Sequence, residues 1–276
     1  MNTHFRGDAL ETPLKFAKRC SPVLALHCSG SDNSQWRGLQ PKIEPMSFFA
    51  APNLLGTHTR GFERALRSFR LSEEAEQVIP LLENLGEPAH LVGHSYGGAL
   101  ALHIARHRPD LVRSLCVYEP TLFSILEAGN LRDLALLREI EALARTIRNG
   151  VEDGYSEFSA QVFTDFWGGL GAWQALSRER REALTRWIGK APLDFDALLN
   201  EPEPTRILVP SIPISLMMGS STHEHTARIV TKLRDQRAPI NLRTLEGAGH
   251  LGPFTFRNQF EMSVLDHIRE AELARN

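Results

Sequence analysis

The chain has 276 residues, which is long enough to bury a substantial core and to hold a catalytic domain. Its 31 basic and 33 acidic residues nearly balance and form no long run of either sign, which argues against nucleic acid or an anionic membrane surface as partner. Segment 1–22 lacks an apolar signal-peptide stretch, and no window approaches the roughly 20 apolar residues of a membrane span, so we expect a cytoplasmic protein.

Short apolar runs alternate with longer helical patterns from Pro22 onward, an order typical of a mostly parallel sheet covered by helices on both faces. Each run is bounded by turn-forming residues. The predicted strands are 23–27, 46–50, 89–93, 114–118, 214–218 and 241–245. The three cysteines cannot all pair within the chain, and Cys28 and Cys116 lie in apolar runs, which is consistent with free thiols in a reducing compartment.

Two helices are indicated beside these strands. Ser72 is a good N-cap for a helix that Gly86 ends, with a kink expected at Pro80. A C-terminal helix is expected to pack one apolar face on the sheet edge, formed by Phe260, Val264, Leu265 and Ile268.

Segment 121–205 interrupts the alternation, because it is rich in Ala, Leu, Arg and Glu and contains no clear strand. We interpret it as a helical cap inserted into an α/β core made of 1–120 and 206–276. Three glycines between 168 and 171 predict a turn that carries Trp167 and Trp173 between helices.

The most specific motif is the pentapeptide 93–97, GHSYG, which follows the predicted strand and precedes a helical run at 99–106. Glycines two positions on either side of Ser95 allow a sharp strand-to-helix turn that exposes its hydroxyl beside the amides of the helix N-terminus. This pattern predicts a nucleophilic serine; the alternative is an ordinary Gly/Ser turn.

A serine hydroxyl needs a base, and His250 is the preferred candidate among 11 histidines. It follows the last predicted strand through a Gly-rich loop and lies late in the chain; the alternative is a surface histidine. His103 and His107 are expected to be solvent-facing or packing residues. His223 and His225 lie only two positions apart without a nearby cluster, so no metal site is assigned.

Acyl transfer also needs donors for the oxygen that becomes negative. The amide of Tyr96 directly follows the nucleophile, and a second amide is expected from the loop after the first strand, where we choose Ser29.

These motifs together, HCSG at 27–30, GHSYGG at 93–98 and GAGH at 247–250, resemble the oxyanion loop, nucleophile elbow and histidine loop of the α/β-hydrolase superfamily. The resemblance covers nearly the whole chain. It implies an α/β-hydrolase fold, and it implies that a helical cap interrupts the sheet where 121–205 lies.

The resemblance also implies an acidic residue after the penultimate strand, but Thr222 occupies that position. Our candidate acid is Glu119, at the end of the strand that follows the nucleophile helix, a position that resembles that of certain dehalogenases. Glu224 is the next choice. Alternatively, Glu119 is a strand-end residue that only binds loop amides.

Serine at the elbow argues against dehalogenase and epoxide-hydrolase chemistry, where a carboxylate attacks carbon. A carboxylic-ester hydrolase that forms an acyl-enzyme and needs no cofactor is the leading hypothesis. Carbon–carbon bond hydrolysis, lactone hydrolysis and a non-catalytic ligand-binding role stay open. We expect an apolar ester-like substrate in a pocket that includes His27, His94, Trp167 and Trp173, although the aromatic residues could instead form the core of the cap. A homodimer stays open.

Overall fold

The structure is a computed structural model that describes residues 20–57, 69–202, 212–236 and 240–274. The predicted boundary at 205 and most of the N-terminal segment lie outside the described residues.

The described residues form a parallel sheet of six strands in the order β2-β1-β3-β4-β5-β6. All six predicted strands are present, and five of them differ from the prediction by only one or two residues at an end. The edge strand β2 is much shorter than predicted, because it pairs with β1 at only two positions. The strands are β1 (Val23–Leu26), β2 (Phe49–Ala50), β3 (Ala89–His94), β4 (Val112–Tyr118), β5 (Ile214–Gly219) and β6 (Ile240–Leu245).

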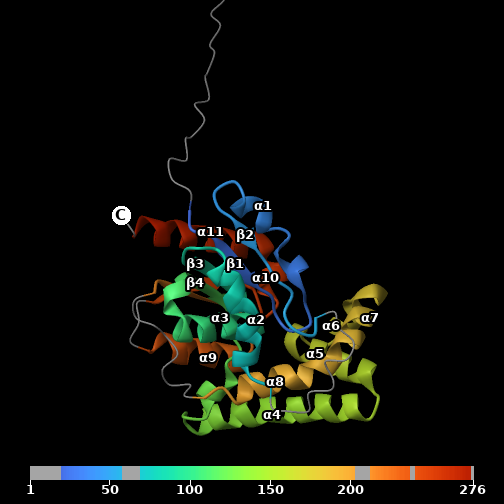
Figure 1. The fold of residues 1–276 in the computed structure, drawn as a ribbon. Coiled ribbons are helices and arrows are strands. Elements are labelled where there is room, and N and C mark those ends of the chain that lie inside the picture. Colours follow the sequence, from blue (N-terminus) through green and yellow to red (C-terminus); the bar gives the residue numbers. More distant parts are fainter. Residues whose placement is uncertain (1–19, 58–68, 203–211, 237–239, 275–276) are drawn as a thin grey trace, which may run out of the picture.

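Helices cover both faces of the sheet (Figure 1). Alternate strand residues point to opposite faces, and because both sets are apolar, each face packs against helices. On one face, Leu24 and Leu91 belong to a core cluster shared with α2 (Leu71–Glu83), α3 (Tyr96–His107) and α9 (Glu224–Arg234). On the other face, Val23 and Val92 belong to a second cluster, which is shared with α1 (Gln40–Ile43) and α11 (Arg257–Leu273). The short helix α10 (Gly252–Thr255) precedes α11. The apolar face predicted for α11 is buried as expected.

Helix α2 begins earlier than predicted. Its N-cap is Arg70, and Ser72 lies within the first turn. The Glu73 carboxylate accepts a hydrogen bond from the Arg70 amide at 3.0 Å, so an acidic side chain satisfies the helix start instead of the serine hydroxyl. Pro80 lies inside the helix as expected, and Gly86 adopts a positive φ of 75° just beyond its end.

Between β4 and β5, the described residues 121–202 form helices joined by turns and short irregular stretches and contain no strand; we call residues 121–202 the helical segment. Gly169 and Gly171, at φ of 91° and 87°, form the predicted turn between α5 and α6, and both flanking tryptophans are buried. The helical segment contains α4 (Leu131–Glu152), α5 (Ser156–Gly168), α6 (Ala172–Ala175), α7 (Arg178–Trp187), the 3-10 helix η5 (Ile188–Lys190) and α8 (Ala191–Leu199). Across the described ranges, no helix has the length and apolar character that crossing a bilayer requires.

Candidate active site

Ser95 lies in the sharp turn between β3 and α3 and has a positive φ of 55° with ψ of −117°. The flanking glycines make this turn sterically possible. A Cβ atom on Gly93 would lie 2.6 Å from the Gly97 carbonyl oxygen, and a Cβ atom on Gly97 would collide with the backbone of Leu26. The backbone therefore adopts the strand-to-helix elbow that the motif predicts.

His250 meets Ser95 over the carboxyl end of the sheet. Its Nε2 lies 3.0 Å from the Ser95 hydroxyl oxygen, and its Nδ1 lies 2.8 Å from Oε2 of Glu119. When Nδ1 carries the ring proton and donates to Glu119, Nε2 is free to accept the serine proton. All three side chains are buried.

Glu119 directly follows β4 and has a positive φ of 42°. Its Oε1 accepts the Gly219 amide at 2.8 Å, while Oε2 also accepts the Thr222 hydroxyl at 2.6 Å. Burial alone would raise the pKa of Glu119, but hydrogen bonds from His250, Gly219 and Thr222 outweigh it and hold the pKa below its ordinary value. The side chain is therefore an ionised acceptor for the imidazole.

The other candidate acid, Glu224, lies elsewhere. It is exposed and forms a bidentate ion pair with Arg132. Of the two candidates, the structure places only Glu119 against His250.

A cavity lies over Ser95 and His250, and Trp167 forms part of its wall. The Trp167 ring also packs on the His250 imidazole, with 4.3 Å between ring centroids and 35° between planes. The polar lining residues include Ser29, Thr121 and Asp194. The apolar wall is formed by Phe123, Phe163, Trp167, Phe195, Leu198 and Leu251.

The other three residues predicted for the pocket are not among the described residues that line this cavity. Trp173 is buried within the helical segment, where its amide donates to Asp165. His27 supports the predicted oxyanion loop from behind: the Leu54 amide donates to its Nε2 at 3.1 Å, and its Nδ1 is 2.8 Å from the Cys28 carbonyl oxygen.

His94 is also buried behind the cavity wall. Its Nε2 lies 2.9 Å from the His250 carbonyl oxygen, which can only accept, so Nδ1 is the acceptor for the Gln35 amide group at 3.1 Å. Burial lowers the pKa of His94 to about 3, so the ring is neutral. Gln35 Oε1 in turn accepts the Cys28 amide at 3.1 Å, so this chain of contacts joins the loop after β1 to the loop that carries His250.

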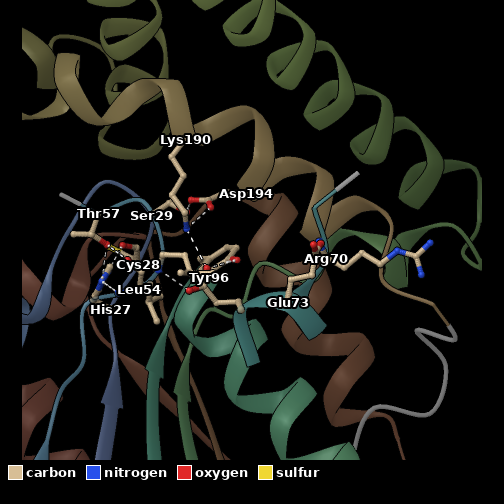
Figure 2. Close-up of polar contacts among 12 residues, drawn as sticks. His27, Cys28, Ser29, Leu54, Thr57, Arg70, Glu73, Tyr96, Lys190 and Asp194 are labelled. Atoms are coloured by element: carbon tan, nitrogen blue, oxygen red, sulfur yellow. Dashed lines mark hydrogen bonds and ion pairs between the residues drawn. The ribbon is translucent and has the colours of Figure 1, made fainter. Parts of the chain in front are cut away.

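Sequence reasoning missed three polar residues near the site. Gln35 lies in the 3-10 helix η1 (Asn33–Trp36), whose sequence carries no motif. Lys190 and Asp194 lie four positions apart, a spacing that most often marks an exposed helix pair. Here they are buried, and the Ser29 hydroxyl donates to Asp194 at 2.6 Å (Figure 2).

Four further histidines within the described residues make local contacts. His103 is buried against Glu201 and stacks on the ring of His107. His223 stacks on Phe166, and His225 pairs with Glu139.

The sequence model of the Alpha/beta hydrolase family matches residues 23–260, which is most of the chain. The chain belongs to the α/β-hydrolase family. It is similar to a haloalkane dehalogenase of Bradyrhizobium diazoefficiens, with 33% identity over 98 residues that make up 35% of this chain and 31% of that protein. It is also similar to Lipase LipV of Mycobacterium tuberculosis, with 34% identity over 113 residues, 41% of each chain. The aligned part thus spans less than half the length of these curated relatives.

Solved structures resemble the chain over almost its full length. MenH from S. aureus has a TM-score of 0.70 at 15% identity, and the alignment covers 92% of this chain and 96% of the MenH chain. The enol-lactonase from Burkholderia xenovorans has a TM-score of 0.67 at 14% identity, with coverages of 92% and 94%. At these identities the likeness shows the α/β-hydrolase fold. Family membership supports a hydrolase enzyme.

Proposed function

We propose that this protein is a serine hydrolase that cleaves carboxylic esters, with Ser95 as nucleophile, His250 as base and Glu119 as the acid that orients the imidazole. One observation carries the proposal. The Ser95 oxygen, both nitrogens of His250 and the Glu119 carboxylate form a continuous hydrogen-bonded line, with separations of 3.0 and 2.8 Å, at the wall of a cavity.

Two backbone amides are suited to stabilise the oxyanion. Tyr96 is the first residue of α3, and its amide lies at the helix N-terminus, where no intrahelical carbonyl accepts it. In the loop after β1, the Cys28 amide is engaged by Gln35, so the Ser29 amide is the better donor, and Ser29 lines the cavity. Losing one such donor typically costs about 3 kcal/mol of transition-state stabilisation.

In the proposed reaction, the Ser95 oxygen attacks the acyl carbon while its proton passes to His250 Nε2. The tetrahedral oxyanion collapses, the imidazolium gives that proton to the departing alcohol oxygen, and an acyl-enzyme forms. Water then attacks the acyl carbon, loses a proton to His250, and Ser95 leaves with that proton. The products are a carboxylic acid and an alcohol.

The cavity wall supports an apolar acyl group as substrate. Four aromatic rings and two leucines face the space, and burying apolar surface there contributes about 25 cal/mol per Å².

The test is labelling with a fluorophosphonate probe, followed by hydrolysis of 4-nitrophenyl esters with acyl chains of two to eight carbons. We expect the label on Ser95, measurable ester turnover, and loss of both in Ser95→Ala. Ser72→Ala is the matched control, because Ser72 is exposed on the first turn of α2. A wild-type protein that leaves Ser95 unlabelled and the esters intact would refute the proposal.

A further inference from the structure

A cluster of three buried charged side chains lies beside the proposed oxyanion loop. Lys190 Nζ is 2.8 Å from Asp194 Oδ1 and 3.2 Å from Glu74 Oε2, and the exposed fractions of the three side chains are 4%, 4% and 0%. Burial would lower the pKa of Lys190, but the two carboxylates outweigh it and raise the pKa, so the ammonium stays charged.

Such a cluster contributes little to the stability of the fold. The free energy needed to remove charges from water often exceeds the free energy gained from their attraction, and apolar residues of similar size would stabilise the fold as well. The three residues also come from different parts of the molecule, since Lys190 and Asp194 belong to the helical segment and Glu74 belongs to α2. The arrangement therefore calls for a role beyond packing.

The cluster binds the side chains of both proposed oxyanion residues. Ser29 donates its hydroxyl to Asp194 Oδ2 at 2.6 Å, and Tyr96 donates its hydroxyl to Glu74 Oε2 at 3.1 Å. Lys190 joins the two carboxylates and lies 4.8 Å from the centroid of the Tyr96 ring. Figure 2 shows Lys190 and Asp194 reaching toward Ser29 and Tyr96.

The helical segment holds the same loop at a second point. Arg180 donates to the Gly30 carbonyl oxygen at 2.7 Å, and a Cβ atom on Gly30 would lie only 3.0 Å from Leu184. Gln35 and His27 fix Cys28 from the side of the sheet. The loop after β1 is thus held at Cys28 by Gln35 and His27, and at Ser29 and Gly30 by the helical segment.

We propose that the Lys190–Asp194–Glu74 cluster aligns the oxyanion hole, with the three residues acting as positioning residues that set the Ser29 and Tyr96 amides through the side chains of Ser29 and Tyr96. The proposal rests on the proposed function. The hole is complete only when the helical segment is packed on the sheet, because two of the three charges come from that segment.

Three substitutions distinguish an effect on the alignment of the oxyanion-hole amides from an effect on the stability of the fold. Ser29→Ala and Tyr96→Phe keep both amides and all three charges but remove the anchoring hydroxyls, and Asp194→Asn neutralises the anchor of Ser29. We expect each to lower kcat by about 10- to 100-fold, less than the 100- to 1,000-fold typical of deleting a donor, with KM within about threefold of wild type. Because Ser29 and Asp194 act as a unit, the double variant should lose no more than the worse single variant.

The matched control is Asp196→Asn. Asp196 lies on the same helix and pairs with Arg148 at 2.7 Å, away from the loop. It should retain the wild-type kcat. If Asp194→Asn does not fold, Ser29→Ala and Tyr96→Phe still decide the question.

The second measurement is the affinity of a trifluoromethyl ketone whose alkyl chain matches the acyl chain of the ester substrate. Its adduct with Ser95 carries a tetrahedral oxyanion, so a purely structural role of the cluster would leave this affinity unchanged. Its affinity should fall in parallel with kcat/KM across the variants. Variants with lower melting temperatures but wild-type kcat and ketone affinity would overturn the alignment role alone. A wild-type protein that neither the fluorophosphonate nor the ketone modifies would overturn the proposed function, and this inference with it.

Discussion

Thr222 occupies the position at which the family resemblance implies an acidic residue, and the candidate acid Glu119 follows the neighbouring strand. The hydroxyl of Thr222 stands after β5 and donates to Glu119, which stands after the neighbouring strand β4. Because β4 and β5 are adjacent and parallel, a carboxylate at the end of either strand can reach the same nitrogen of His250. The threonine then supplies a hydrogen bond that favours the ionised carboxylate.

Glu119→Gln should lower kcat by about 1,000- to 10,000-fold, because the amide can no longer hold the imidazole in the right tautomer and stabilise its charged form. KM should change little. The measurement is steady-state hydrolysis of a 4-nitrophenyl ester, with thermal melting to verify the fold. Glu224→Gln is the control and should keep wild-type turnover; a loss in that variant alone would exclude Glu119 as the acid.

At the scale of elements, local patterns predicted the strands and the elbow well. Residues 89–98 carry both signals, an apolar run and the glycines that a sharp turn needs, so the sequence alone located Ser95. The start of α2 was less predictable, because Ser72 and the pair Arg70 and Glu73 offer competing ways to satisfy the same amides. The two-residue length of β2 depends on its neighbour in the sheet, which no local pattern encodes.

A second buried histidine network joins β3, β4 and α11 at the other end of the strands. The Ser114 hydroxyl lies 2.7 Å from His90 Nδ1 and 2.8 Å from His267 Nε2, and Glu272 lies 3.1 Å from His90 Nε2. Burial lowers the pKa of His90 to about 4, despite the nearby carboxylate, and the pKa of His267 to about 3. Both rings are therefore neutral in the folded protein.

This network predicts loss of stability in mild acid. The unfolded histidines bind protons below about pH 6.5 while the folded ones do not, so the unfolded state holds more protons and the free energy of unfolding falls as the pH drops from 6.5 toward 4. Urea unfolding at pH 7.5, 6.0 and 5.0 measures the effect. The His267→Leu variant should show a shallower dependence between pH 6.5 and 5; a slope equal to that of wild type would contradict the assignment.

On the scale of the whole molecule, the sequence predicts those residues of the candidate site that lie in short motifs of consecutive residues. Ser95 and His250 lie in short motifs. Lys190 and Asp194 acquire their place near Ser29 only through the packing of the helical segment, across 165 positions of sequence for the Asp194 contact. His27 and His94 were predicted to line the pocket, but both nitrogens of His27 and Nε2 of His94 instead contact loop backbone, and Nδ1 of His94 contacts the Gln35 side chain.

The composition of the cavity predicts discrimination by charge. Among its described lining residues Asp194 is acidic and none is lysine or arginine. A carboxylate in the acyl chain would lose its hydration without gaining a cation. We expect 4-nitrophenyl butyrate to exceed 4-nitrophenyl hemisuccinate in kcat/KM by roughly 100-fold or more. The ratio should shrink in Asp194→Asn, and equal rates for the two esters in the wild type would refute this reading.

The connection between Ser95 and His250 spans 155 positions, and this has a consequence during synthesis. Synthesis adds Ser95, Glu119 and the helical segment before it adds His250. Under the proposed mechanism, the nascent chain carries a serine hydroxyl without its base for most of its elongation, and reactivity with acyl donors should begin only after β6 has emerged and paired with β5.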